Sequence, residues 1–300
     1  MKKENFTQGC GFVAGNYVPI ADAAIPIRDF GFLRSDATYD VAHVWDGAFF
    51  RLEAHLDRFF RNVDRLRMVC PLSRDEVRNV LIECVRRSGL RDAYVEAICT
   101  RGEPPAATRD PRQAENRFYA FAAPFVPYAS DEVKKRGLHL IIGEPRRIPP
   151  EAVDPTVKNY HWHDLTKGLF EAFDRGADNA VLLDLDGNLT EGPGFNVFCV
   201  IDGAVQTPGR GVLDGITRRT TIELCESLGI PCVETDIPEE SVLNADEAFI
   251  TSTAGGIMPV TRIERRILGN GAPGPVTTRL ADAYMALHRD EKYLTRVHYD

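Results

Sequence analysis

The sequence predicts an α+β protein with two domains. Its 300 residues are 44% hydrophobic, which is enough for one large or two medium domains with real cores. Strand-like and helix-like segments are mixed without the strict alternation of a doubly wound sheet. The pattern changes across the polar segment 127–137. We therefore expect a small N-terminal domain over 1–126, a linker over 127–137 and a larger domain over 138–300, each mixing helices and strands.

The N-terminal domain begins with a hairpin and a helix. Segment 39–52 has strand-like residues on both sides of Asp46-Gly47, a pair that is typical of a tight hairpin turn. Segment 52–69 predicts an amphipathic helix because its apolar residues recur at helical spacing. The stripe consists of Leu52, Leu56, Phe59, Val63 and Leu66.

A second helix and two strands complete this domain. Ser73 and Glu76 have the spacing of a capping box, and Gly89 is a typical helix stop. Segments 93–101 and 117–126 are predicted strands. The residues between these strands are rich in proline and charge, which predicts an exposed, mobile loop.

The C-terminal domain contains more strands. Predicted strands cover 138–143, 179–192, 195–208 and 247–253, with hairpin turns at Asp186-Gly187 and Asp202-Gly203. An amphipathic helix is expected over 216–229, where it ends at a glycine. The last ~25 residues are polar and helix-like in their pattern.

Composition excludes several classes of protein. The formal net charge is −8 without a long basic run, which disfavours nucleic acid or an anionic membrane as a partner. No segment approaches the ~18 to 20 apolar residues of a membrane span, and the N-terminus lacks the apolar stretch of a signal peptide. The seven cysteines include no Cys-x-x-Cys pair, which favours buried free thiols in a reducing compartment. We expect a cytoplasmic protein.

Two segments have the character of anion-binding turns. "GVLDGITRRT" (211–220) leads from a turn into a helix, and "TSTAGGI" (251–257) follows a strand with small residues. Free backbone N–H groups at such places hold phosphate. A helix cap explains the first segment equally well and a tight turn the second. Together they suggest one phosphate that is held without a Walker lysine.

Two charged residues are candidates for the same site. Glu191 stands between a strand and a Gly-Pro-Gly turn, where it is either a solvated turn residue or a carboxylate that faces a cleft. Arg58 lies on the first helix beside Phe59 and Phe60. Most such arginines are ion-paired or on the surface, but this one can reach a phosphate.

The stretch "DPTVKNYHWHDLTKGLF" (154–170) contains the candidate nucleophile. Lys167 is expected on a solvated helix face, and His161 and His163 lack a third ligand with metal spacing, so no metal is predicted. Neither Gly-x-Ser-x-Gly nor Gly-x-Gly-x-x-Gly is present. Lys158 is therefore the best nucleophile. A lysine, a phosphate cup and a carboxylate are the components of a pyridoxal phosphate site.

Five motifs in order resemble one known family. "RLEAHLDRF", "TVKNYHWHDL", "LTEGPGFNVF", "GVLDGITRR" and "TSTAGGIMPVT" are similar to motifs of the class IV aminotransferases, pyridoxal-phosphate enzymes of fold type IV. The resemblance covers about residues 20–265. The family includes branched-chain aminotransferases, D-amino acid aminotransferases and aminodeoxychorismate lyase. Residues 28–52 and the end of "AGGIMPVT" look most like the (R)-selective amine:pyruvate transaminases.

The resemblance implies roles at the cofactor. Lys158 matches the lysine that forms the internal aldimine and moves the proton, Glu191 the acid at the pyridine nitrogen, and Arg58 the arginine on the phosphate. Leu213 matches a residue that packs on the ring, and Asn196 a supporting residue. The other phosphate donors implied are Ile216, Thr217, Ser252 and Thr253. These roles suit the chemistry, because a protonated pyridine nitrogen makes the ring an electron sink.

The resemblance also implies a substrate pocket. Positions that line the pocket, or fall near it, are Tyr39, Val41, Tyr94, Glu96 and Trp162. Arg34 stands where the family often has histidine, and a guanidinium there can hold a carboxylate. Arg109 is the candidate for the loop arginine that takes the keto-acid carboxylate, with Arg112 as the neighbouring alternative.

The expected enzyme is a pyridoxal-phosphate aminotransferase with its cofactor between the domains. The resemblance implies a homodimer that moves an amino group from an (R)-amine to pyruvate in a ping-pong cycle, giving a ketone and D-alanine. D-amino acid aminotransferase is the first alternative, followed by branched-chain aminotransferase or aminodeoxychorismate lyase; "TYDV" and "WDGAFFRL" argue against the lyase. A binding or regulatory protein on the same scaffold is the alternative from a different class.

Overall fold

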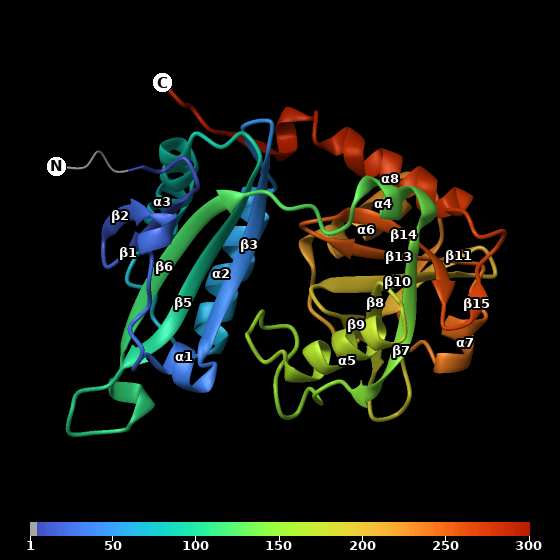
Figure 1. Cartoon of the computed structure of the whole chain (residues 1–300), viewed down its shortest axis with the longest axis horizontal. Coiled ribbons are helices and arrows are strands. Elements are labelled where there is room, and N and C mark those ends of the chain that lie inside the picture. The colour runs from blue at the N-terminus through green and yellow to red at the C-terminus, as the bar shows by residue number, and fades with distance from the viewer. Residues whose placement is uncertain (1–4) are drawn as a thin grey trace. The chain divides into compact units, whose positions relative to one another are not determined.

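The computed structural model describes residues 5–300, which divide into two compact units. The first unit contains the chain up to Val126 together with Val157–Tyr160 and His288–Asp300. The second unit contains Pro127–Thr156 and His161–Leu287. Each unit has its own sheet (Figure 1). No sequence pattern indicated that the segment around Lys158 and the C-terminal residues group with the first unit.

The first unit is built on a seven-stranded antiparallel sheet of order β16-β4-β3-β5-β6-β1-β2. Its strands are β1 (Cys10–Val13), β2 (Asn16–Pro19), β3 (Ala37–Trp45), β4 (Ala48–Phe50), β5 (Ala93–Glu103), β6 (Glu115–Pro124) and β16 (Leu294–Arg296). Its helices are α1 (Phe30–Arg34), α2 (Leu52–Arg65) and α3 (Arg74–Ser88), with short 3-10 turns η1 (Ile20–Asp22), η2 (Pro111–Gln113) and η3 (Glu291–Tyr293).

The turn and the helix ends that were predicted in this unit are confirmed. Asp46 and Gly47 both have positive φ, at 46° and 75°, as the tight turn between β3 and β4 requires. Ser73 and Glu76 form a reciprocal capping box at the start of α3, and Gly89 closes the helix with φ 68°. The helix-like pattern of the last ~25 residues is confirmed for Pro275–Leu287, but after this helix β16 is a strand that pairs with β4.

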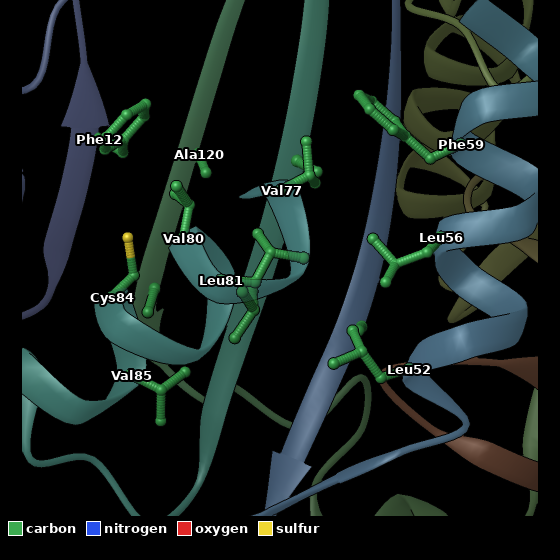
Figure 2. Packing of buried hydrophobic residues seen from close by; sticks show 14 of the residues in the cluster. Phe12, Leu52, Leu56, Phe59, Val77, Val80, Leu81, Cys84, Val85 and Ala120 are labelled. Atoms are coloured by element: carbon green, nitrogen blue, oxygen red, sulfur yellow. The ribbon is translucent and has the colours of Figure 1, made fainter. Parts of the chain in front are cut away.

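One hydrophobic core lies between the sheet and its two long helices. Figure 2 shows the apolar side chains of α2 and α3 converging with side chains of the sheet. Successive strand residues point to opposite faces, so Ala42, Val44 and Val95 join this core. Tyr39 on β3 and Glu96 on β5 have the opposite parity, so they belong to the other face of the sheet, which we call the tyrosine face.

The segment 157–160 occupies part of the edge of β3. Of the residues of β3, only Val44 and Trp45, at its C-terminal end, pair with β4. At the other end, Thr38 forms a bridge with Asn159. The carbonyl oxygen of Lys158 accepts hydrogen bonds from the Tyr39 backbone N–H at 3.3 Å and the Thr38 hydroxyl at 2.7 Å. The backbone of Lys158 is therefore fixed to β3.

The second unit is built on a nine-stranded mixed sheet. The main order is β12-β11-β10-β13-β14-β7-β8, with β15 beside β14 and β9 beside β10. Its strands are β7 (Leu138–Arg146), β8 (Asn179–Leu183), β9 (Glu191–Gly192), β10 (Phe195–Ile201), β11 (Ala204–Pro208), β12 (Cys232–Thr235), β13 (Glu247–Ser252), β14 (Gly256–Ile263) and β15 (Arg266–Ile267). Its helices are α4 (Asp131–Arg136), α5 (His163–Asp174), α6 (Ile216–Ser227), α7 (Glu239–Leu243) and α8 (Pro275–Leu287).

Both units combine helices with sheets, so the α+β prediction is confirmed. Helix α4 lies inside the segment that was predicted as a linker, where Ser130 caps it by accepting from the Val133 N–H. Buried Glu247 caps α8: its carboxylate accepts from the backbone N–H groups of Val276 and Thr277, at 3.1 and 2.9 Å, and from the Thr277 hydroxyl at 2.8 Å.

Two of the bulk observations can be compared with the structure. None of the seven cysteines forms a disulfide bond in the described residues 5–300, and five of them are buried. Within residues 5–300, no helix has both the length and the apolar character that crossing a membrane requires.

Candidate active site

A buried charge cluster joins β3 to α2 in the first unit. The Asp40 carboxylate accepts from Nε and Nη2 of Arg58 at 2.7 and 2.9 Å, and it lies 2.8 Å from Nδ1 of His55. Burial alone would raise the pKa of Asp40, but Arg58 and His55 outweigh it and hold this pKa well below its usual range. Burial lowers the pKa of His55 despite Asp40, which favours a neutral imidazole.

The cluster fixes the position of the predicted phosphate arginine. Arg58 is almost completely buried, and the bidentate pairing with Asp40 determines where its guanidinium lies. Its role at the cofactor phosphate stays a prediction. Asp40 and His55 were not predicted from the sequence. The available signal was a charged residue at a core-facing position of a strand, in "TYDVAHV".

Lys158 lies beside a pair of stacked tyrosines. Its Nζ is 4.5 Å from the centre of the Tyr39 ring, a cation–π distance. The Tyr39 and Tyr160 rings are stacked with their centres 4.3 Å apart and their planes 14° apart. The structure thus brings together Lys158 and the predicted pocket residue Tyr39. Tyr160 was not predicted, although its position two residues after Lys158 suits the same side of an extended segment.

Glu96 completes this group on the tyrosine face. Its two carboxylate oxygens accept from different hydroxyls, that of Tyr94 at 3.0 Å and that of Tyr160 at 2.7 Å. Burial raises the pKa of Glu96, against the opposing influence of both tyrosines and Lys158. Burial also raises the pKa of both tyrosines, so each remains a protonated donor at neutral pH. Val41 pairs with Glu96 across the two strands.

Glu191 is held by an arginine and a backbone amide in the second unit. Its Oε1 accepts from Nη2 of Arg147 at 3.1 Å, and its Oε2 accepts from the Leu213 N–H at 3.0 Å. Nη1 of Arg147 also donates to Asp164 at 2.7 Å. Burial alone would lower the pKa of Arg147, but Glu191 and Asp164 raise it. Glu191 is therefore a buried, charge-paired residue rather than a solvated turn residue.

The turn around Leu213 is also fixed. Asn196 donates its side-chain N–H to the Leu213 carbonyl at 2.9 Å. A Cβ on Gly215 would come within 2.1 Å of the Asn196 Oδ1, so only glycine fits before α6. Asn196 thus supports the residue predicted to pack on the cofactor ring. Arg147 and Asp164 were not predicted, because their partner lies on a distant segment of the chain.

The predicted phosphate cup has the properties of an anion site. Helix α6 begins at Ile216, and its N-cap residue Gly215 provides no side-chain cap, so the first N–H groups point out of the helix. Helix α6 contacts β13, which ends at Ser252. The Ser252 Oγ is buried and lacks a hydrogen-bond partner among residues 5–300. Phosphate oxygens would accept hydrogen bonds from the first N–H groups of α6 and from the Ser252 hydroxyl, so these residues fit a phosphate.

The other predicted residues occupy varied positions. Thr217 is buried in the first turn of α6, and Thr253 is half-buried just after β13. Trp162 precedes α5 in the second unit, where its ring lies next to Gly194. Arg34 is exposed, with its guanidinium carbon 3.6 Å from the centre of the Phe30 ring.

The two loop arginines are both exposed. Arg109 lies between β5 and β6, and Arg112 pairs with Asp110 at 2.6 Å. Which of them binds a carboxylate stays a prediction. In the part of the chain that the structure describes, no group of three or more His, Cys, Asp or Glu side chains is arranged to hold a metal ion.

The fold, the lysine whose backbone is bound to β3, the paired Glu191 and the uncapped helix define a class of protein, the enzymes that use pyridoxal phosphate. The chain belongs to the amino-transferase class IV family, whose model matches residues 37–263. It is therefore a pyridoxal-phosphate-dependent aminotransferase of fold type IV, and the resemblance that its motifs indicated is confirmed at the level of the family.

Relatives with known names support this membership. The chain is 32% identical to a putative branched-chain-amino-acid aminotransferase of Methanocaldococcus jannaschii, over 91% of this chain and 94% of the relative. It is 28% identical to the D-alanine aminotransferase of Bacillus licheniformis, over 90% and 93%. The solved branched-chain amino acid aminotransferase of Thermobaculum terrenum in its PLP-form is 27% identical, with a TM-score of 0.84 over 99% of this chain and 100% of that chain.

Proposed function

We propose that this aminotransferase moves an amino group from an (R)-amine to pyruvate, releasing a ketone and D-alanine in a ping-pong cycle. The observation that carries the proposal is the tyrosine face beside Lys158. It offers the rings of Tyr39, Tyr94 and Tyr160 and the carboxylate of Glu96. Aromatic rings suit the apolar side group of an amine donor.

In this proposal Lys158 and Glu191 have separate roles in catalysis. Lys158 binds the cofactor aldehyde and then moves the proton at the substrate carbon. Glu191, held by Arg147 and the Leu213 N–H, keeps a proton at the pyridine nitrogen. Pyridoxal phosphate, when bound, supplies the electron sink that stabilises charge at that carbon.

The phosphate would be held by the start of α6 and the end of β13. Its donors are proposed to be Ile216, Thr217, Ser252 and Thr253, with Arg58 as a further contact. The uncapped N-terminus of α6 and the unpartnered Ser252 hydroxyl support this assignment.

We also propose a homodimer in the cytoplasm. Large apolar side chains are exposed on and before α1, which is unusual for a surface that faces only water. They are Ile25, Ile27, Phe32 and Leu33. A second copy of the chain that covers them would also bring its own residues near the segment that carries Arg34. Sedimentation of the holoenzyme, compared with a Phe32→Ser variant, tests this surface.

An amino-donor panel tests the reaction. The holoenzyme is given pyruvate with (R)-1-phenylethylamine, its (S)-enantiomer, D-alanine or L-leucine, with 2-oxoglutarate replacing pyruvate in parallel. Fast formation of ketone and D-alanine from the (R)-amine alone is the expected result. No turnover of the (R)-amine, together with fast exchange between D-alanine and 2-oxoglutarate, would refute the proposal.

D-amino acid transamination is the second candidate. The relative named D-alanine aminotransferase and the exposed guanidinium of Arg34 favour it, because an arginine can hold the carboxylate of an amino acid. Branched-chain transamination is the third, favoured by the relative from Methanocaldococcus jannaschii. The stereochemistry of the preferred donor separates these two, since one acts on D- and the other on L-amino acids.

A further inference from the structure

We propose that Glu96 selects the keto-acid acceptor by charge: it disfavours an acceptor with a second carboxylate, such as 2-oxoglutarate, and admits one with an uncharged side group. The inference deepens the proposed function, because it assigns part of the substrate preference to one residue. It does not depend on which amine is the donor.

The hydrogen bonds of Glu96 are compatible with an ionised carboxylate, although burial raises its pKa. A phenolic hydroxyl has a single hydrogen to donate, and Tyr94 and Tyr160 each direct theirs at a different oxygen of Glu96. Two such donors stabilise the negative charge and hold the carboxyl group in one orientation. The charge is thus kept at a fixed place on the tyrosine face.

Glu96 is connected to Lys158 through two aromatic rings. Tyr160 donates to Glu96, its ring stacks on Tyr39, and the Lys158 amine lies against the Tyr39 ring. Lys158 is also close enough to favour the charged form of Glu96 electrostatically. An acceptor that is converted at Lys158 must therefore place its side group within the field of this carboxylate.

The surroundings of Glu96 strengthen that field. Its cross-strand partners are Val41 on β3 and Phe121 on β6. The group is buried, and charges in such surroundings interact more strongly than in water. Lys158 provides the opposite charge, while Asp40 adds to the negative side.

The burial of Glu96 also points to function. A raised carboxyl pKa in the folded state means that the charged form costs stability above that pKa. Its two hydrogen bonds come from tyrosine hydroxyls, whereas Asp40 has the guanidinium of Arg58 as a bidentate partner. A costly buried carboxylate beside the reactive lysine is typical of a functional site.

The test compares acceptors in the wild-type holoenzyme and in Glu96→Gln. With one donor fixed, kcat/KM is measured for pyruvate and for 2-oxoglutarate. We expect the ratio of 2-oxoglutarate to pyruvate to rise by about tenfold or more in Glu96→Gln, because a like-charge contact weakens binding strongly. Glu115→Gln makes the same change of charge at an exposed position on β6 and is expected to leave the ratio unchanged.

Two further measurements test the same inference with a second variant and without turnover. Tyr160→Phe keeps the carboxylate but removes one of its donors, so it should shift the ratio in the same direction by a smaller factor, even if Glu96→Gln fails to fold. The affinity of the holoenzyme for glutarate and for butyrate, measured by calorimetry, needs no turnover. Glutarate should gain affinity in Glu96→Gln relative to butyrate.

The outcomes separate this inference from the proposed function. If the wild-type enzyme does not turn over (R)-amines, the ratio of kcat/KM for 2-oxoglutarate to that for pyruvate is measured with the donor that it does use. An unchanged ratio in Glu96→Gln, together with a lower unfolding midpoint, is the behaviour of a purely structural residue and overturns the inference. If the enzyme uses a D-amino acid but no (R)-amine, a changed ratio would support Glu96 as the selector even though the (R)-amine assignment is refuted.

Discussion

Arg147 and Glu191 form a buried ion pair in which Nη2 lies 3.1 Å from Oε1. Arg147 directly follows β7, and Glu191 lies in β9. Nη1 of the same guanidinium donates to Asp164 at 2.7 Å. The positive charge of Arg147 thus favours the ionised form of the carboxylate that is proposed to hold the pyridine nitrogen.

Replacing this arginine should impair catalysis more than it impairs folding of the second unit. Arg147→Lys keeps a positive charge but loses the forked geometry that reaches two carboxylates, and we expect kcat to fall about tenfold or more. Arg147→Gln removes the positive charge beside Glu191 altogether, and we expect kcat to fall further. The neighbouring Arg146 is exposed, and Arg146→Gln should leave kcat unchanged.

The Asp40 cluster makes a pH-dependent contribution to stability. Because the folded pKa of Asp40 is depressed, its contribution is present above the unfolded pKa of ~3.9 and is lost as pH falls toward the folded value. Asp40→Asn should therefore destabilise the protein by about 3 kcal/mol at pH 7, with a smaller difference below pH ~4. Urea unfolding from pH 3 to 7 measures this. Exposed Asp57, paired with Arg74, gives a control, Asp57→Asn, with an effect within ~1 kcal/mol.

Ser252 and its neighbour Thr251 provide a test variant and a matched control for the proposed phosphate cup. Both hydroxyls are buried and lack hydrogen-bond partners in the part of the chain that the structure describes, but they point to opposite faces of β13. Ser252→Ala should weaken cofactor binding about tenfold, since a hydrogen bond to a charged group is worth ~1.5–3 kcal/mol. Thr251→Val should leave the cofactor dissociation constant unchanged. Equal effects from both variants would argue against the assignment of Ser252.

Glu247 is expected to govern the stability of α8. Its carboxylate accepts three hydrogen bonds at the start of the helix, so Glu247→Ala should lower the free energy of unfolding by about 1–3 kcal/mol. Thr277→Val removes only the hydroxyl bond and should cost about 1 kcal/mol. A double-mutant cycle measured by chemical denaturation checks the coupling, and additive effects would contradict a shared cap.

The predictions that succeeded rest on local patterns. The capping box at Ser73, the turn at Asp46-Gly47 and the apolar stripe of α2 involve residues a few positions apart, so their spacing is visible in the sequence. Lys158 and Glu191 were candidates from the residues around them, and the order of five motifs then indicated a family, which is confirmed. Their individual roles stay predictions.

The residues that escaped prediction act across long separations. His55 meets Asp40 from a different element, and Arg147 meets Glu191 across 44 positions of the chain. Tyr160 reaches Glu96 across 64 positions. No spacing rule links such residues, because their proximity depends on how strands and helices pack. The strand β16 was missed for the same reason, since it forms only by pairing with β4.

The contribution of 157–160 and β16 to the first sheet has a consequence for the protein during its synthesis. The free edges of β3 and β4 emerge from the ribosome long before Lys158 and Leu294 are available to cover them. At roughly 5–20 residues per second, the edge of β4 waits on the order of 10–50 s for its partner strand. For that time the nascent chain presents an open strand edge, the kind of surface that chaperones shield and that other chains can join.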